Sequence, residues 1–396
     1  MLKKELPDGW RLVKLKEVAK IDNKAISPDE MRGELQSYIG LENIESNTGR
    51  LVSFSETLGD DIKSNKFGFT EEHILYGKLR PYLNKVYLPD FAGVCSTDII
   101  PIKPDSDLLI REFLGYFLRT PEFVSMINAK SSGANLPRVN PKALLDVYIP
   151  LPPLETQRKI VAILEKAEAT QRLRAEADVL TQQLLQNVYM SIFGDPISNP
   201  QSWDIVKLEC VCKIITDGEH ATPKRSQSGI YLLSARNIRD HEIDLSDVDY
   251  IDDEEYDRIS KRIVPQNGDV LISCSGSVGR MSRVKDDIKF QMVRSVALIR
   301  PDNQKLNSAY LEYTFDTAYL KMQIAQSVNQ SSQANLFQGK IRELKIPIPP
   351  MDLQQVFAEI VEKYEQLTES QRITSRRALT LYNSLLSKAF IGELIA

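Results

Sequence analysis

The chain repeats a distinctive proline-rich run, and this repeat constrains the fold more than any other feature. The run IPLPPLETQ occupies residues 149–157 and IPIPPMDLQ occupies residues 346–354, so 197 residues separate the two copies. The beginnings of the repeated units also match, with WRLVKL at residues 10–15 and WDIVKL at residues 203–208. A repeat of this length in a chain of 396 residues predicts one module used twice.

Each proline-rich run precedes a long polar segment that carries a stripe of apolar residues. Proline suits the first turn of a helix, so the Pro-Pro pairs are expected to start two long helices. Residues spaced by three and four positions form the stripe, which in the first helix should also include Leu173 and Ala177. Because an apolar stripe avoids water, the two helices are predicted to pair as a coiled coil. The alternative is that each helix lies on its own globule.

The stripe residues expected at the interface of the two helices, or with a partner, come from both segments. They are Ile160, Leu164, Ala167, Leu180, Leu184 and Val188 in the first helix, and Phe357, Val361, Tyr364, Leu381 and Leu385 in the second.

The segments between the repeated motifs predict β-rich globules that also contain helices. Buried runs at residues 38–44 and 231–238 are typical of strands. Residues 113–128 and 310–328 are amphipathic and predict one helix in each globule.

Composition bounds the location and the chemistry of the protein. No stretch is long and apolar enough to span a membrane, and the first residues lack the apolar region of a signal peptide. The four cysteines have no histidine nearby, so we expect reduced core thiols in a cytoplasmic protein and no metal site. The net charge of −4 does not indicate nucleic-acid binding, but it can conceal a basic face.

Motifs for catalysis and for cofactor binding are missing from the sequence. It contains no phosphate-binding loop, nucleophile elbow, His-Glu-x-x-His zinc motif or Cys-x-x-Cys pair. Three histidines leave little for acid–base chemistry. We therefore expect a binding and scaffolding protein that is not an enzyme and uses no cofactor or metal ion.

A shorter repeat lies before each proline-rich run. SSGANL occupies residues 131–136 and SSQANL occupies residues 331–336, which are 200 residues apart. Its repetition in two otherwise diverged halves favours a functional loop. A plain surface turn, or a support for the helix that follows, is the alternative.

Together these motifs resemble the specificity subunit of type I restriction–modification systems. The resemblance covers the whole chain and also rests on LYGKLRPYLNK at residues 75–85 and TDGEHATP at residues 216–223, where Glu219 replaces the usual threonine. It implies two target recognition domains, each of which reads one half of a bipartite, asymmetric sequence in double-stranded DNA. It also implies docking of two methylation subunits, and of restriction subunits through that methylation core.

The resemblance completes the predicted architecture. The expected fold class is α+β, with two similar mixed α/β target recognition domains joined by two long antiparallel helices in a coiled coil, related by a pseudo-twofold repeat. The helices would set the spacing between the half-sites. The expected boundaries are 1–152 for the first recognition domain, 153–195 for the central helix, 196–349 for the second recognition domain and 350–396 for the C-terminal helix.

Reading a DNA sequence requires side chains that reach base edges and other side chains that contact phosphates. Arginine suits guanine, and asparagine or glutamine suits adenine. The candidates for phosphate contacts are Lys78, Arg80, Lys85, Lys130, Lys224, Arg280 and Arg283, and those for base contacts are Asn84, Asn135, Arg138, His220, Ser277, Gln330 and Asn335.

Two other classes of function stay open from the sequence. An adenine-N6 DNA methyltransferase with a related recognition part needs an (Asn/Asp)-Pro-Pro-(Tyr/Phe) motif, which Asn140-Pro141 and Asn199-Pro200 do not complete. A coiled-coil scaffold that binds only protein would not shift duplex DNA in a gel, even with methylation subunits present.

Overall fold

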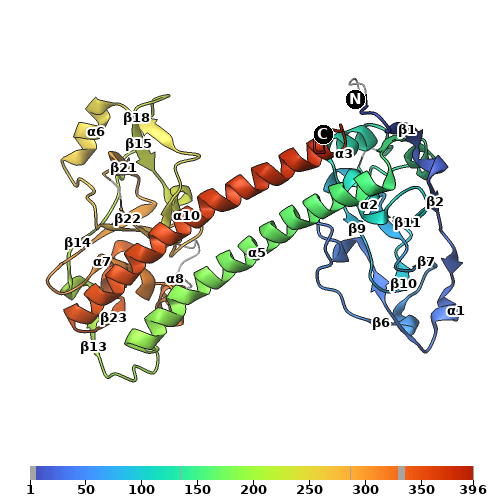
Figure 1. The fold of residues 1–396 in the computed structure, drawn as a ribbon. Coiled ribbons are helices and arrows are strands. Elements are labelled where there is room, and N and C mark those ends of the chain that lie inside the picture. The colour runs from blue at the N-terminus through green and yellow to red at the C-terminus, as the bar shows by residue number, and fades with distance from the viewer. Residues whose placement is uncertain (1–5, 134, 286, 329–334, 396) are drawn as a thin grey trace. The chain divides into compact units, whose positions relative to one another are not determined.

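A four-stranded antiparallel sheet organises each half of the chain in the computed structural model (Figure 1). The structure describes residues 6–133, 135–285, 287–328 and 335–395. The chain forms two compact units, Met1–Ala175 with Ile373–Ala396 (unit 1) and Glu176–Arg372 (unit 2). Mixed sheet and helix content in two domains agrees with the predicted fold class.

Unit 1 contains two four-stranded sheets. The main sheet has the order β2 (Ala19–Ile21), β11 (Ile99–Pro104), β8 (Ile74–Gly77), β9 (Val86–Tyr87), and all its pairs are antiparallel. The second has the order β3 (Ala25–Ile26), β7 (Lys66–Phe69), β10 (Gly93–Cys95), β5 (Tyr38–Ile39), and its β10–β5 pair is parallel. The remaining elements of unit 1 are α1 (Pro28–Met31), β4 (Leu35–Gln36), β6 (Thr57–Leu58), α2 (Arg111–Leu118), α3 (Pro121–Ala129), α4 (Pro141–Leu145) and the 3-10 turns Leu15–Glu17, Leu41–Asn43, Gly59–Asp61 and Pro81–Leu83.

Unit 2 repeats this plan. Its main sheet has the order β14 (Cys212–Asp217), β22 (Val296–Pro301), β19 (Val270–Ser273), β20 (Met281–Arg283), again antiparallel. Its second sheet has the order β18 (Asp249–Ile251), β15 (Ile230–Leu233), β21 (Phe290–Met292), with a parallel β15–β21 pair. The remaining elements are β16 (Ile238–Arg239), β17 (Glu242–Ile243), α6 (Asp253–Ser260), α7 (Ser308–Thr314), α8 (Ala318–Val328), α9 (Gln338–Glu343) and the 3-10 turns Leu208–Cys210 and Ala235–Asn237.

The two repeated motifs of each half pair with one another. The strand of the opening motif, β1 (Arg11–Lys14), lies antiparallel to β12 (Tyr148–Leu151) of the proline-rich run. In unit 2, β13 (Asp204–Lys207) pairs in the same way with β23 (Lys345–Ile348). These ribbons bring the beginning and the end of each globular segment together, directly before a long helix starts.

The amphipathic segments form two helices each, and the prediction of a single helix was wrong. In unit 1 the break falls at Thr120, whose hydroxyl accepts a hydrogen bond from the backbone N–H of Phe123 and so caps α3. The following Pro121 has no N–H to donate to α2, so it favours the start of a new helix. In unit 2 the break lies between α7 and α8.

Two long helices follow the proline-rich runs, as the sequence predicts. Helix α5 (Leu154–Phe193) has 40 residues and α10 (Met351–Ala389) has 39. Each begins in one unit and ends in the other. In unit 2, Phe193 packs against Phe357 with ring centroids 5.3 Å apart, whereas Thr181 accepts a hydrogen bond from Gln371. Contacts therefore move backwards along α10 as they move forwards along α5, which makes the pair antiparallel.

The buried glutamine of each proline-rich run ties the helix start to the globular segment. Gln157 is fully buried; its carbonyl accepts from Ile110 N at 2.8 Å, and its amide donates to Leu108 O and Pro152 O at 2.9 Å each. We call Gln157 and its counterpart Gln354 the helix-start glutamines.

Gln354 repeats this arrangement. It is also fully buried, and it accepts from Asn307 N at 2.8 Å and donates to Lys305 O and Pro349 O at 3.3 and 2.8 Å. Every partner in unit 2 lies 197 residues after its partner in unit 1, so the repeat extends to single hydrogen bonds.

The least exposed residues of the two long helices recur every three or four positions, and we call this line of residues the seam. The middle of the seam is polar. In α10 the seam runs through Gln354, Phe357, Val361, Tyr364, Thr368, Gln371, Ser375, Ala378, Tyr382, Leu385 and Ala389. At its centre, Gln371 Nε2 donates to Thr181 Oγ1 at 3.1 Å, and Gln171 Nε2 donates to Ala378 O at 3.5 Å.

Three leucines predicted at the helix pair are instead exposed. Leu180, Leu184 and Leu381 have exposed fractions of 67%, 52% and 58%, and Leu173 is also exposed. These leucines therefore do not pack between the two helices, because the middle of the seam uses polar side chains, and the predicted contact with a partner stays a prediction. The other predicted positions, Ile160, Leu164, Ala167, Val188, Phe357, Val361, Tyr364 and Leu385, are buried or half-buried in the cores of the two units.

Within the described residues, no helix is long and apolar enough to cross a membrane. The four cysteines are free thiols, and no group of acidic, cysteine or histidine side chains in the described part could hold a metal ion. Burial raises the pKa of the Cys95, Cys212 and Cys274 thiols to about 12, so these groups are poor nucleophiles.

Candidate nucleic-acid interface

The two main sheets end in the same backbone arrangement. Beyond β8, Lys78 N donates to Asp98 O at 2.9 Å and Lys78 O accepts from Val139 N at 2.9 Å. Beyond β19, Cys274 N donates to Ser295 O at 2.8 Å and Cys274 O accepts from Leu336 N at 2.9 Å.

The next residues pair as isolated bridges, Leu79 with Arg138 and Ser275 with Asn335. We call these groups the sheet-end clusters: Lys78–Arg80, Asp98 and Arg138 in unit 1, and Cys274–Ser275, Ser295 and Asn335 in unit 2.

The isolated bridges show that the two short repeats, SSGANL and SSQANL, are not structurally equivalent when they are aligned by their sequence. Asn335 occupies the place of Arg138, 197 residues earlier, and Leu336 is buried like Val139. Asn135 lies three residues before that place, and Leu136 is 44% exposed. The 200-residue spacing of the short motif is therefore not a structural equivalence, because Arg138 and Val139 correspond to Asn335 and Leu336, which lie 197 residues later. Residues 331–334 lie outside the described residues.

The unit 1 cluster gathers basic side chains around one carboxylate. Asp98 Oδ1 lies 3.2 Å from Arg138 Nε and 3.9 Å from Lys78 Nζ. Arg80 is exposed in a left-handed conformation, with φ of 51°, and its backbone N donates to Pro137 O at 2.7 Å. Three basic groups and one acidic group give this cluster a net positive charge, which suits a phosphate backbone.

Two of the other candidates in unit 1 have internal partners. Asn84 is 7% exposed, and its amide donates to Asn47 Oδ1 and Arg119 O at 3.1 Å each. Lys85 is half-buried and donates to Leu41 O at 2.6 Å. The sequence marked both as DNA-facing, and the structure uses both within the fold. Lys130 and Asn135 are exposed.

In unit 2, the candidates near the sheet-end cluster are more polar than basic. His220 is exposed, and its Nε2 lies 2.8 Å from the Asp217 carboxylate. Ser277 is exposed in the loop that joins β19 to β20, where Gly276 and Gly279 adopt positive φ angles of 68° and 88°. Arg280 is half-buried at the end of that loop.

Exposed Lys224 is held by its backbone, because its N–H donates to Glu255 Oε1 at 3.1 Å. Gln330 lies outside the described residues.

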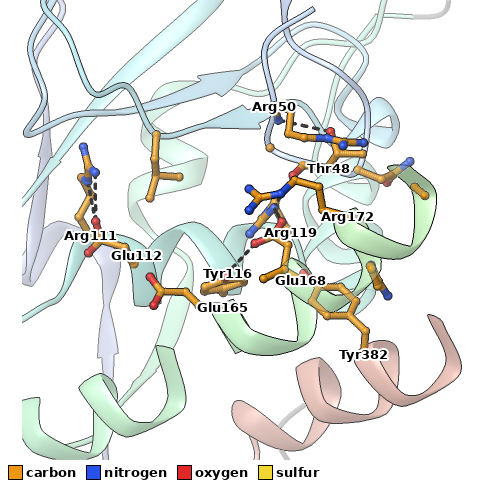
Figure 2. A pocket seen from close by; sticks show the side chains of 16 residues that line it. Thr48, Arg50, Arg111, Glu112, Tyr116, Arg119, Glu165, Glu168, Arg172 and Tyr382 are labelled. Carbon is orange, nitrogen blue, oxygen red and sulfur yellow. Dashed lines mark hydrogen bonds and ion pairs between the residues drawn. The ribbon is translucent and has the colours of Figure 1, made fainter. Parts of the chain in front are cut away.

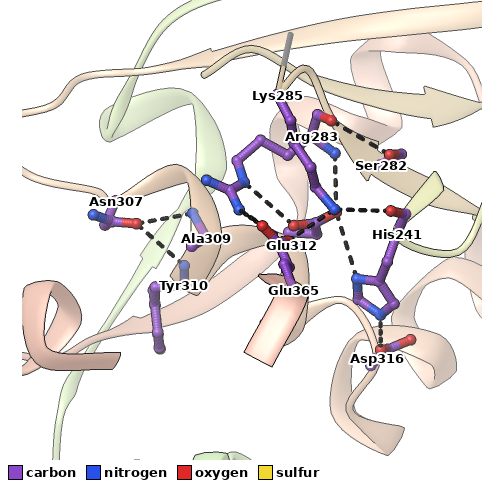
Figure 3. Close-up of polar contacts among 10 residues, drawn as sticks. All are labelled: His241, Ser282, Arg283, Lys285, Asn307, Ala309, Tyr310, Glu312, Asp316 and Glu365. Atoms are coloured by element: carbon purple, nitrogen blue, oxygen red, sulfur yellow. Dashed lines mark hydrogen bonds and ion pairs between the residues drawn. The ribbon is translucent and has the colours of Figure 1, made fainter. Parts of the chain in front are cut away.

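Arg283 is paired within unit 2 and its side chain is only 19% exposed, which argues against its predicted contact with phosphate (Figure 3). Its Nε lies 3.4 Å from the fully buried carboxylate of Glu312, and its Nη2 lies 3.1 Å from both oxygens of Glu365. Two carboxylates of the same unit therefore hold this guanidinium through Nε and Nη2. The sequence could not show this, because the partners lie 29 and 82 residues away.

One exposed arginine was missed by the sequence analysis. Arg294 directly precedes Ser295 of the unit 2 cluster and is exposed, and its backbone N donates to Glu219 O at 3.0 Å. It therefore lies where β22 begins, beside the TDGEHATP segment. The sequence did contain one indication: Arg294 directly precedes Ser295, which is the counterpart of Asp98.

Comparison with known proteins agrees with the repeat. A family model described as type I restriction modification DNA specificity domain matches residues 7–179 and again residues 200–379. The EcoDI type I restriction enzyme specificity subunit of Escherichia coli is 32% identical over 179 residues, which are 45% of this chain and 38% of that subunit. The MjaVIII specificity subunit of Methanocaldococcus jannaschii is 22% identical over 395 residues, covering 93% of this chain and 88% of that subunit.

A solved structure has the same fold over almost the full length. It is a chain from a study of complex assembly and conformational transition of the type I R-M system, with 25% identity, a TM-score of 0.64 and coverage of 99% of this chain and 100% of that one. The match to the EcoDI subunit, in contrast, spans well under half of that protein. Because the family model matches most of both halves, this chain belongs to the family of type I restriction modification DNA specificity domains.

Proposed function

We propose that this chain is the DNA-recognition subunit of a type I restriction–modification complex and that each unit reads one half of a bipartite site. The observation that carries this proposal is the pair of sheet-end clusters. Their backbones are equivalent, but their side chains differ: Lys78, Asp98 and Arg138 correspond to Cys274, Ser295 and Asn335. The same scaffold with different side chains suits two different half-sites.

The side chains fit the chemistry of base reading. An arginine such as Arg138 can bind guanine through two hydrogen bonds, and an asparagine such as Asn335 can do the same with adenine. Exposed Arg80, Lys130 and Lys224 are placed on loops and helix ends that could contact phosphates. The different residues at equivalent positions would give an asymmetric site.

The long helices would form an antiparallel coiled coil that sets the spacer between half-sites. The three–four spacing of the seam supports this arrangement. The exposed leucines, Leu180, Leu184 and Leu381, would contribute to docking of two methylation subunits, since exposed apolar groups on a helix favour a protein partner. Methylation would then occur in those subunits, and restriction subunits would join through them.

An exchange of the second recognition segment tests the proposal. Residues 200–345 are replaced by the corresponding segment of another such subunit, and the methylated motif is read by methylome sequencing with the methylation subunits present. We expect one half of the motif to change and the other to persist. A motif in which both halves change together, or neither changes, would contradict independent reading by the two units. A matched exchange of residues 10–148 should change the opposite half.

A further inference from the structure

We propose that Glu168 and Glu365 are equivalent positioning residues, each of which holds a cation of its own unit and so fixes the rotation of a recognition domain about its long helix. This inference rests on the proposed function, because its consequence is read as the spacing of two half-sites. The two carboxylates lie 197 residues apart, at the same place in α5 and α10.

Both carboxylates lie on the same face of the helix as the helix-start glutamine. Eleven residues separate Gln157 from Glu168, and the same number separates Gln354 from Glu365. Eleven residues are about three helical turns, or roughly 16 Å along the axis. A globular segment held at one point of a helix can pivot around it. A second attachment three turns away restricts that rotation.

In unit 1 the cation is Arg119, at the end of α2 (Figure 2). Its Nη1 lies 2.9 Å from Glu168 Oε1 and also donates to Thr48 O, while Tyr116 donates its hydroxyl to Glu168 Oε2 at 2.8 Å. The guanidinium lies 4.6 Å above the Tyr116 ring, and Arg119 is 8% exposed. Both oxygens of the carboxylate are therefore used by α2.

In unit 2 the cations come from the sheet instead (Figure 3). Glu365 accepts from Arg283, at the end of β20, and lies 2.8 Å from Lys285 Nζ. Arg283 N also donates to the fully buried Glu312 of α7 at 3.0 Å. The carboxylate thus connects α10 to β20 and, through Arg283, to α7.

The two units reach this arrangement with different residues. By the 197-residue spacing, Tyr116 corresponds to Tyr313 and Arg119 corresponds to Asp316. Asp316 has the wrong charge to pair with Glu365; it binds His241, which stacks on Tyr313 at 4.2 Å. The carboxylate on the helix is the common feature, and its cation is supplied from a different element in each unit. Because both units form an ion pair at this helix position with different cations, we infer that the attachment of each domain to its long helix requires it.

The test uses isosteric variants of the full chain in complex with its methylation subunits. Glu168→Gln and Glu365→Gln remove the charge and keep the shape, and exposed Glu155→Gln and Glu362→Gln on the same helices are matched controls. Methylation rates are measured on duplexes with both half-sites and with spacers one base pair shorter than, equal to and one base pair longer than the natural spacer.

We expect the preference of the wild-type complex for its natural spacer to fall about tenfold in each variant, the equivalent of about 1.4 kcal/mol. The base preference in each half-site should stay the same, and the controls should behave as wild type. A merely structural role would lower the rate on all three spacers equally, and that result would overturn the inference. If a glutamine variant does not assemble, Glu168→Asp and Glu365→Asp keep the charge, and unchanged spacer preference in these shortened variants would also overturn it.

The wild-type complex separates this inference from the proposed function. If it recognises no bipartite motif, the proposed function fails. If it does, and the glutamine variants keep its spacer preference, only the role of Glu168 and Glu365 fails.

Discussion

Single side chains decide how each globular segment meets its long helix. The helix-start glutamines each satisfy three backbone groups while fully buried, which explains why both proline-rich runs end in glutamine. A leucine there would have similar volume but no hydrogen bonds, and would leave two carbonyls and one N–H unsatisfied.

Replacing Gln157 should therefore destabilise unit 1. We expect Gln157→Leu to lower the free energy of unfolding by about 3 kcal/mol, since each buried backbone group left without a partner is unfavourable by about 1–3 kcal/mol. Denaturant unfolding followed by circular dichroism measures the change. Exposed Gln183→Leu on the same helix is the control and should change little. Equal effects of the two substitutions would contradict the role of the buried glutamine.

A half-buried histidine, His241, should make unit 2 sensitive to pH. Burial alone would lower the pKa of His241, but hydrogen bonds to Asp316 and Glu312 and their charges raise it to about 9. Arg283 and Lys285 also face this cluster, and Lys285 donates to His241 O. Because the folded pKa lies above the ordinary value of about 6.5, the stabilisation is complete below about pH 6.5. It is lost as the pH rises through about 9.

The comparison of wild type with His241→Gln checks this expectation. The wild-type melting temperature should fall more steeply than that of the variant between about pH 6.5 and pH 9. Parallel curves would show that the protonated histidine does not stabilise the fold. Groups that do not contact His241 titrate alike in both proteins, so the difference between the curves reports on His241 and on its partners Glu312 and Asp316.

At the scale of elements, the long helices carry a seam whose two ends are apolar and whose middle is polar. Aromatic and aliphatic groups such as Phe193, Phe357 and Leu385 fill the ends, whereas Thr181 and Gln371 meet in the middle. Polar groups in a helix seam weaken pairing but favour one register. Two paired helices can set a distance along DNA only if they pair in one fixed register.

Lengthening both helices together should therefore lengthen the spacer. Seven residues inserted before Thr181 in α5 and seven after Gln371 in α10 keep the seam in phase and add about 10.5 Å. Duplex DNA rises 3.4 Å per base pair, so we expect a spacer longer by about three base pairs, with both half-sites unchanged and weaker methylation because the DNA also rotates.

The methylated motif of the doubly extended chain is the measurement for this prediction. The same insertion in α5 alone is the control. It should prevent assembly, because both helices connect the same two units and their lengths would no longer match. An active double variant with the original spacer would show that the helices do not set it.

For the whole molecule, charge and the proposed partners determine how DNA is bound. A net charge of −4 gives the isolated chain few phosphate contacts beyond its basic loops. We expect weak DNA binding by the chain alone and tight binding with methylation subunits. The logarithm of affinity should also fall more steeply with the logarithm of salt concentration in the complex, by about 0.9 for each added phosphate contact.

Titration of DNA binding at several salt concentrations, with and without the methylation subunits, measures both quantities. The pure chain should show no methyltransferase, nuclease or ATPase activity. An identical salt slope in the two preparations would mean that the partners add no phosphate contacts. Catalysis that persists through different purification routes would contradict a pure recognition role.

The sequence by itself determined the repeat, the two mixed domains, the starts of the long helices and membership in the family. These follow from local chemistry: proline pairs start helices, apolar periodicity marks buried faces, and a motif used twice reveals one module. It also placed Arg80 among the candidates for phosphate contacts and Arg138 and Asn335 among those for base contacts, and the structure brings Arg80 and Arg138 together in the sheet-end cluster of unit 1, with Asn335 in that of unit 2.

Only the tertiary structure decided which polar residues face inward. Arg283 and Asn84 look like DNA contacts in the sequence, yet their partners, Glu365 and Arg119, are 82 and 35 residues away. The true spacing of the loops, 197 residues and not 200, came from backbone pairing with the ends of β8 and β19. A side chain's role depends on the atoms that folding brings near it, and sequence spacing cannot supply those contacts.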